Sequence, residues 1–198
     1  MNSKSRIIQF GPGRTGTTLI WQILNLLFNN VEKSHVFVDD PDAYHVVTYR
    51  DFRDALLSHM RVVSEEVNPI NIDLSYRGHY QKILLELDKY TNVHYKTLYL
   101  KYELFYNDYD YIFNKLEIFL DIQIPKEKRD KITKYVSIEQ NKKRQEKFNS
   151  FSEHDPNTHI HGEHIFHPEP GQWKKLNDEN RIALNRTVNY NLKKWGYI

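Results

Sequence analysis

Apolar and polar residues along the chain follow two periods, one typical of buried strands and one of amphipathic helices. Strand-like apolar runs cover 6–10, 44–49 and 93–99, with a short extended piece at 35–38. Helical periodicity covers 17–29, 53–65, 76–90, 110–121, 127–136 and 178–194. Strands that alternate with helices predict an α/β fold, a parallel sheet flanked by helices. Ligands of such sheets bind outside the carboxyl ends of the strands.

The length of the chain predicts one domain. A chain of 198 residues can bury a substantial core, and we expect a single domain over 1–198. The stretch 139–171 is polar and closes with Pro168, Pro170 and Gly171, which predicts a long loop or lid.

The segment Gly11-Pro-Gly-Arg-Thr-Gly-Thr-Thr18 lies between the first strand-like run and the first helix. Strand, glycine-rich turn and helix in this order direct backbone N–H groups and the positive helix end at one point, which suits a phosphate. The pattern G-x4-G-K-[ST] of nucleotide hydrolases fits, except that Thr17 stands at its lysine position. The cation of this turn is Arg14 instead, so we predict a P-loop-like site with a displaced charge.

A second candidate phosphate site follows the strand-like run at 44–49. Arg50 ends this run, and Ser58 lies eight residues later in the next predicted helix. A forked guanidinium and a hydroxyl donor suit a second phosphate. Taken alone, the pair is equally compatible with a surface charge and a helix residue without function.

These segments together resemble the sulfotransferases that use 3′-phosphoadenosine 5′-phosphosulfate (PAPS). Arg14-Thr-Gly-Thr-Thr18 is similar to the K-S-G-T-T loop that binds the 5′-phosphosulfate, and Arg50 with Ser58 is similar to the 3′-phosphate segment. Lys33-Ser-His35 resembles the K-[ST]-H triplet whose histidine takes the acceptor's proton. The resemblance implies a P-loop-like sulfotransferase domain with PAPS as sulfuryl donor and 3′-phosphoadenosine 5′-phosphate (PAP) as product.

The resemblance extends over almost the whole chain. Leu98-Tyr-Leu-Lys-Tyr-Glu-Leu104 is similar to the family's strand ending in Y-E-D, and Val136-Ser-Ile138 to its T-S-F adenine contact. Gly171-Gln-Trp-Lys174 is similar to G-D-W-K before the closing helix. On this match Tyr102 lies beside adenine, and Ser137 contacts it.

The resemblance also implies a role for each matching residue. His35 would be the general base, and its ordinary pKa of about 6.5 suits proton transfer at neutral pH. Arg14 and Lys33 would neutralise charge on the leaving 5′-phosphate and the transferring group, so no metal is required. The implied cofactor-binding residues are Arg14, Thr15, Gly16, Thr17, Thr18, Arg50, Ser58, Tyr102 and Ser137.

Two departures from the family pattern affect the cofactor site. Phe166-His-Pro168 stands where the family carries the R-K-G clamp of the 3′-phosphate, so two cations are missing. The nearby replacements that remain open are Lys142, Lys143, Arg144, His164 and His167. Leu19 stands where a tryptophan beside adenine is expected, and Trp21 points to a different side of the helix.

Half of the 10 histidines lie in the predicted lid, at His154, His159, His161, His164 and His167. Their H-x-H and H-x-x-H spacing is compatible with a zinc site. Without cysteines or helical i, i+4 spacing, we favour histidines that face water or the cofactor phosphates. We therefore predict no functional metal.

Composition limits the partners of the protein. With 28 Lys and Arg against 26 Asp and Glu, the net charge of +2 does not predict nucleic-acid binding. The absence of cysteine is typical of a reducing compartment, and the longest apolar stretch, 19–28, is too short to span a membrane. We expect a cytoplasmic enzyme that acts on a hydroxyl of a small-molecule or glycan acceptor, and its oligomeric state stays open.

Two other functions stay open. A nucleotide kinase or other NTPase would need a lysine at Thr17 and usually an acidic residue for magnesium at Arg50. A non-catalytic module that binds PAP or another nucleotide is compatible with the missing R-K-G cations, but Lys33 and His35 argue against it.

Overall fold

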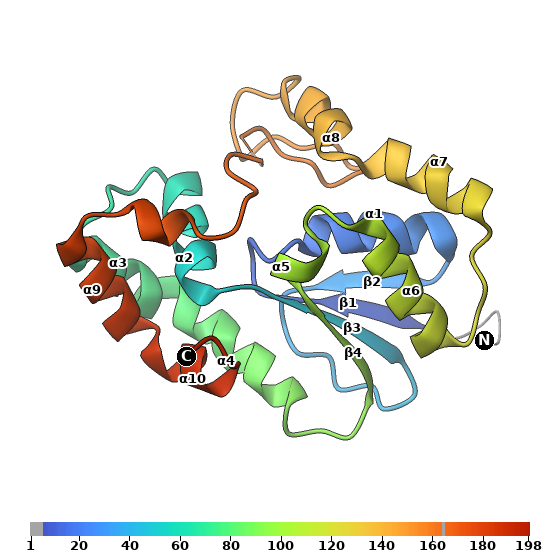
Figure 1. Cartoon of the computed structure of the whole chain (residues 1–198), viewed down its shortest axis with the longest axis horizontal. Coiled ribbons are helices and arrows are strands. Elements are labelled where there is room, and N and C mark those ends of the chain that lie inside the picture. The colour runs from blue at the N-terminus through green and yellow to red at the C-terminus, as the bar shows by residue number, and fades with distance from the viewer. Residues whose placement is uncertain (1–5, 164) are drawn as a thin grey trace.

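Parallel strands form one sheet at the centre of the molecule (Figure 1). The computed structural model describes residues 6–163 and 165–198. The four strands lie in the order β2-β1-β3-β4 and are β1 (Ile7–Phe10), β2 (Val31–Ser34), β3 (Tyr44–Tyr49) and β4 (Lys96–Lys101). All pairs are parallel. The predicted α/β class, a parallel sheet flanked by helices, is confirmed.

Helices cover both faces of the sheet because successive strand residues point to opposite sides. Phe10 and Val47 lie in one core cluster with residues of α2 (Phe52–Val62), α3 (Pro69–Ser75), α4 (Gln81–Tyr90), α9 (Asp178–Thr187) and α10 (Asn189–Lys194). Ile7 and Val46 lie in the other with residues of α1 (Thr17–Leu27), α5 (Tyr102–Phe105), α6 (Tyr109–Leu120) and α7 (Lys126–Val136). Within the described ranges, no helix is both long and apolar enough to cross a bilayer.

The carboxyl ends of the strands lie at one edge of the sheet, as parallel pairing requires. The residues that follow β1, β2, β3 and β4 are Gly11, His35, Arg50 and Tyr102. Each of these residues belongs to a segment in which the sequence analysis predicts site residues. The chain passes from β1 to β2 on one side and on to β3 on the other, so a ligand crevice is expected beside β1.

Two strands differ from the sequence prediction. The second strand is Val31–Ser34, paired with β1 from Ile7 to Phe10, and 35–38 is not a strand. This edge strand is partly exposed, so no apolar run marks it. The fourth strand begins at Lys96 instead of 93 because the turn after α4 occupies the preceding residues.

Three helical segments also differ from the sequence prediction. α3 was missed, although Asn68 caps it by accepting a hydrogen bond from Asn71 N–H and Pro69 occupies its first turn. The predicted helix 76–90 starts with a π-helical turn, Tyr76–Tyr80, and the helix 178–194 breaks at Val188.

The predicted loop 139–171 starts with a helix, α8 (Ile138–Gln145). The remainder, 146–171, is called the lid. Apart from an isolated bridge between His154 and His161, its described residues form no helix or strand. A short 3-10 helix, η2 (Gln172–Lys175), follows the lid.

Candidate functional site

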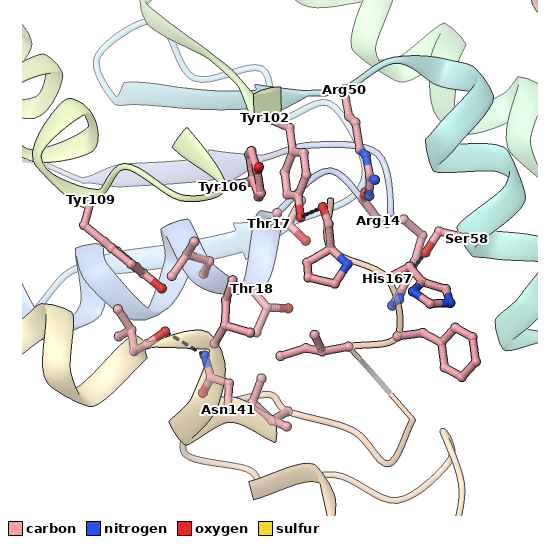
Figure 2. Close-up of a pocket in the computed structure, with 18 residues that line it drawn as sticks. Arg14, Thr17, Thr18, Arg50, Ser58, Tyr102, Tyr106, Tyr109, Asn141 and His167 are labelled. Carbon is pink, nitrogen blue, oxygen red and sulfur yellow. Dashed lines mark hydrogen bonds between the residues drawn. The ribbon is translucent and has the colours of Figure 1, made fainter. Parts of the chain in front are cut away.

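A pocket lies at the carboxyl edge of the sheet (Figure 2). The loop after β1 and the start of α1 contribute Arg14, Gly16, Thr17, Thr18 and Leu19. The ends of β3 and β4 and the helices that follow contribute Arg50, Ser58, Tyr102, Tyr106 and Tyr109. The opposite side comes from α7, α8 and the lid, with Val136, Ile138, Asn141, Ile160, Ile165, Phe166, His167 and Pro168. The pocket therefore joins both predicted phosphate segments and the predicted adenine-side tyrosine.

The loop after β1 leaves the start of α1 open toward the pocket. Gly16 precedes α1 with φ 83°, and no side chain caps the helix. A Cβ at Gly16 would lie 2.8 Å from the ring of Phe105, so both the backbone angle and the close approach require glycine. The uncapped N–H groups and the positive helix end can hold an anion, with the side chains of Thr17 and Thr18 beside it.

Thr15 has a different position from the other predicted loop residues. Its hydroxyl is fully buried, donates to Pro12 O over 2.7 Å and lies 3.0 Å from Thr48 Oγ1. Its side chain therefore stabilises the loop against β3 and does not face the pocket.

Lys33 reaches the start of α1 from the end of β2. Its Nζ donates to Thr18 Oγ1 over 2.9 Å, which places its charge beside the pocket. Burial lowers the pKa of Lys33 to about 8, so the ammonium form still predominates at pH 7. An anion at Thr18 would favour that charged form.

His35 is oriented by the loop after β1. Its Nδ1 lies 2.7 Å from Gly11 O, and because a carbonyl only accepts, Nδ1 carries the proton. The lone pair is then on Nε2. His35 is exposed, yet partial desolvation by neighbouring protein atoms, and then the charge of Lys33, lower its pKa, while the Gly11 hydrogen bond raises it. The imidazole is therefore neutral at pH 7 and able to accept a proton at Nε2.

Arg14, Arg50 and Ser58 converge where β3 leads into α2. Arg14 Nε donates to Ser58 Oγ over 2.9 Å, and Arg50 Nη1 lies 3.5 Å from Arg14 O. Arg50 is 4% exposed, and its guanidinium lies 4.3 Å from the centre of the Tyr102 ring. The predicted 3′-phosphate pair and the loop arginine thus share one end of the pocket.

Aromatic residues form the predicted adenine side. Tyr102 stacks on Tyr106, with ring centres 5.9 Å apart, and Leu19 lines the pocket where the family pattern has tryptophan. Burial raises the pKa of Tyr102 to about 12, so its hydroxyl stays a donor. Trp21 packs instead on His159, 4.2 Å away, as its position on the helix predicted.

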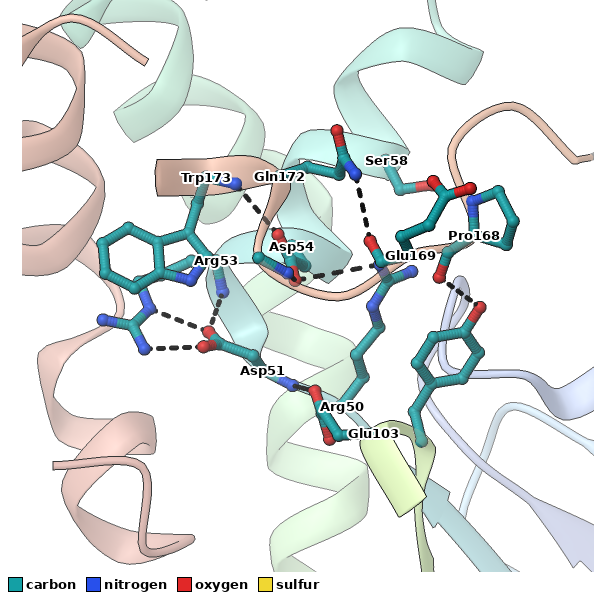
Figure 3. Close-up of polar contacts among 12 residues, drawn as sticks. Arg50, Asp51, Arg53, Asp54, Ser58, Glu103, Pro168, Glu169, Gln172 and Trp173 are labelled. Atoms are coloured by element: carbon teal, nitrogen blue, oxygen red, sulfur yellow. Dashed lines mark hydrogen bonds and ion pairs between the residues drawn. The ribbon is translucent and has the colours of Figure 1, made fainter. Parts of the chain in front are cut away.

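The lid lies against the predicted cofactor ligands through its backbone (Figure 3). Tyr102 donates to Pro168 O over 2.8 Å, and Arg50 Nη2 donates to Glu169 O over 3.4 Å. In the middle of the lid, Thr158 O accepts a hydrogen bond from Gln22 Nε2 over 2.7 Å. The lid carbonyl groups therefore accept hydrogen bonds from Tyr102 and Arg50, two of the predicted cofactor-binding residues.

Asp54 holds the root of the lid and was not anticipated from the sequence. Its carboxylate is buried, accepts hydrogen bonds from Gly171 N–H at 2.6 Å and Trp173 N–H at 3.0 Å, and lies 3.8 Å from Arg50 Nη2. The neighbouring Arg53 pairs with Asp51 and lies 3.7 Å from the Trp173 ring centre. The opposite charges of Arg50 and Asp54 at i, i+4 spacing were the available sequence signal.

Other predicted residues lie outside this pocket. Ser137 does not line it, because its hydroxyl accepts a hydrogen bond from Gln140 N–H and caps α8. Lys142 and Lys143 are exposed, and Arg144 donates to Tyr135 O. His167 lines the pocket, whereas His164 lies outside the described residues. Tyr106, Tyr109 and Asn141 line it without a sequence motif to mark them.

The lid histidines contact one another and α1. His154 stacks on His161 with ring centres 4.8 Å apart, and His161 Nδ1 donates to Phe151 O. In the described part of the chain, no three His, Asp or Glu side chains are grouped so as to hold a metal ion.

Solved structures share this architecture. Mouse sulfotransferase SULT7A1, complexed with PAP, matches 98% of this chain and 85% of its own with a TM-score of 0.69 and 12% identity. Retinol dehydratase, in complex with androsterone and the inactive cofactor PAP, matches 97% of this chain and 82% of its own with a TM-score of 0.65 and 16% identity. The chain has the sulfotransferase fold. By sequence, no family model and no curated protein matches it.

The fold that the loop motifs implied is therefore confirmed. At identities of 12% and 16%, the likeness concerns the sulfotransferase fold and not the ligands of this chain. The roles of His35, Lys33 and the cofactor-binding residues stay predictions.

Proposed function

We propose that this protein transfers a sulfuryl group from PAPS to a hydroxyl of an acceptor. The observation that carries the proposal is the single pocket that joins the loop after β1, Arg50 with Ser58, and Tyr102 at the open edge of a sulfotransferase fold. The Nε of Arg50 is buried without a hydrogen-bond partner among the described residues, and Gly16 leaves the start of α1 open. Both features fit a ligand with more than one phosphate.

Three groups of residues bind three parts of the donor PAPS in this proposal. The start of α1 with Thr17, Thr18 and Lys33 holds the 5′-phosphosulfate. Arg50 and Ser58 hold the 3′-phosphate. Leu19, Tyr102 and Tyr106 contact adenine.

In the proposed transfer, His35 Nε2 accepts the proton of the acceptor hydroxyl. The acceptor oxygen forms a bond to sulfur while the bond from sulfur to the bridging oxygen of the 5′-phosphate breaks, and PAP leaves with that electron pair. Lys33 neutralises the charge that develops on the leaving phosphate. Such transfers depend mainly on positioning and electrostatic stabilisation.

Calorimetry with PAP, PAPS, and ATP with magnesium separates this function from its rivals. A sulfotransferase binds PAP and PAPS in preference to ATP and sulfates a simple phenol. A kinase or NTPase prefers ATP with magnesium, against which stand Thr17 at the lysine position and Arg50 at the strand end. Binding of PAP without turnover of any acceptor would identify a non-catalytic module.

The acceptor class is proposed as a small molecule or a glycan. A screen of alcohols, phenols, sterols and sugars with radiolabelled PAPS measures which hydroxyl is modified. Sulfation of none of them would contradict an enzymatic role, whereas PAP binding alone would preserve the nucleotide site.

A further inference from the structure

Arg14 does not lie where its place in the loop motif suggests. The motif places this cation at the 5′-phosphosulfate, yet Arg14 extends to α2, where its Nε donates to Ser58 Oγ over 2.9 Å. Figure 2 shows Arg14 and Arg50 at the same end of the pocket, beside Ser58. Lys33, in contrast, contacts Thr18 at the start of α1.

The backbone holds Arg14 in an uncommon conformation. Its φ is 71°, in the left-handed region that non-glycine residues seldom adopt. Such conformations are retained where the surrounding structure enforces them and cluster at ligand-binding sites. Here Arg50 Nη1 lies 3.5 Å from the carbonyl oxygen of Arg14, so the second arginine contacts the same strained residue.

Two charged guanidinium groups lie together at this end of the pocket. Burial, and then the charge of Arg50, lower the pKa of Arg14 to about 10, which leaves both guanidinium groups charged at neutral pH. Asp54 lies 3.8 Å from Arg50 and also accepts hydrogen bonds from Gly171 and Trp173. Glu65, Glu66 and Glu163 line a neighbouring hollow together with Arg14 and Ser58. Two guanidinium groups that meet beside Ser58 offer several charged hydrogen-bond donors at one place, which suits a phosphate dianion.

None of the described lid residues that line the pocket is a lysine or an arginine. Phe166-His-Pro168 stands where the family clamp has Arg and Lys, and the backbone carbonyls of Pro168 and Glu169 face Tyr102 and Arg50. We propose that Arg14 binds the 3′-phosphate together with Arg50 and Ser58, and so replaces the missing lid cations as the residue that selects 3′-phosphorylated nucleotides. This inference rests on the proposed PAPS site.

Calorimetry of the full chain with PAP and with adenosine 5′-monophosphate (AMP) isolates the 3′-phosphate, since the two ligands differ in that group alone. Arg14→Gln should weaken PAP by about 10- to 100-fold and AMP by less than about threefold. Arg14→Lys keeps the charge but loses the fork, so it should give a smaller loss that is again confined to PAP. The double variant Lys142→Ala/Lys143→Ala removes two exposed cations of α8 and should change neither affinity.

Thermal melting of each variant establishes that it is folded at the temperature of titration. If Arg14→Gln does not fold, the affinities of Arg14→Lys for PAP and AMP test the role of Arg14. Equal weakening of PAP and AMP would assign Arg14 to the 5′ end and overturn this inference while leaving the proposed function intact. Failure of the unmodified chain to prefer PAP over AMP would overturn the inference, and failure to bind either nucleotide would overturn the proposed function as well.

Discussion

The two sides of the pocket are built in different ways. On the strand-end side, Gly11, His35, Arg50 and Tyr102 each follow a strand directly, so the register of the sheet sets their positions. On the lid side, single hydrogen bonds span 66 residues from Tyr102 to Pro168, 117 from Asp54 to Gly171 and 136 from Gln22 to Thr158. The difference suggests that chemistry depends on the strand ends, whereas the lid governs access and can rearrange at lower cost.

The largest effect that we expect is on the strand-end side. His35→Ala should lower kcat by roughly 10²–10⁴ with a phenol acceptor and leave PAP affinity nearly unchanged, because a general base acts on the acceptor. Steady-state rates and calorimetry measure the two effects. His94→Ala, at an exposed position, is the control. A wild-type rate with an alcohol of high pKa would mean that His35 is structural.

Arg50 tests whether the strand ends also determine nucleotide choice. Arg50→Ala should weaken PAP by on the order of 2–5 kcal/mol and AMP much less, because a buried charged contact to the 3′-phosphate is lost. Arg61→Ala is a matched control, since Arg61 lies on α2 but does not line this pocket. If both nucleotides lose affinity equally, Arg50 does not bind the 3′-phosphate.

Asp54 tests the lid side. Asp54→Asn should lower the free energy of unfolding by about 1.5–3 kcal/mol and speed proteolysis within 146–171, because charged hydrogen bonds to the lid root are weakened. Urea unfolding and timed digestion measure these changes. Asp73→Asn, in an exposed pair with Arg77, should cost less than about 0.5 kcal/mol. Similar digestion of both variants would show that Asp54 does not hold the lid.

The smallest effect concerns pH. Because an anion favours charged Lys33, binding raises its pKa from about 8 and takes up a proton, so PAP affinity should fall as pH rises. The fall should be about tenfold between pH 7 and 9, by calorimetry. Lys33→Gln should flatten this profile. At acid pH, kcat/KM should decline below the lowered pKa of His35, as the base becomes protonated. An unchanged profile in Lys33→Gln would contradict contact with the donor.

Sequence reasoning succeeded where the signal was local. The loop from Gly11 to Thr18 lies between a strand and a helix within a short segment, and both predicted phosphate segments line one pocket. The edge strand Val31–Ser34 was misplaced because partly exposed strands carry little apolar pattern. Asn68 and Ser137 cap α3 and α8, two helices in polar segments whose starts the capping residues mark better than hydrophobic periodicity does.

The contacts of the lid could not be predicted from local sequence patterns. Nothing near Thr158 or Pro168 indicates Gln22 or Tyr102 as its partner, since these contacts depend on the assembled fold. Arg14 is the mixed case, because the loop motif identified the residue but not the direction of its side chain.

The hydrogen bond from His35 to Gly11 O joins the proposed base to the first residue of the predicted phosphate loop. A displacement of that loop would therefore turn the imidazole as well as shift the bound donor. Evolution toward a new acceptor would then proceed most easily by exchange of lid residues, because a change in the loop would misalign donor and base at the same time.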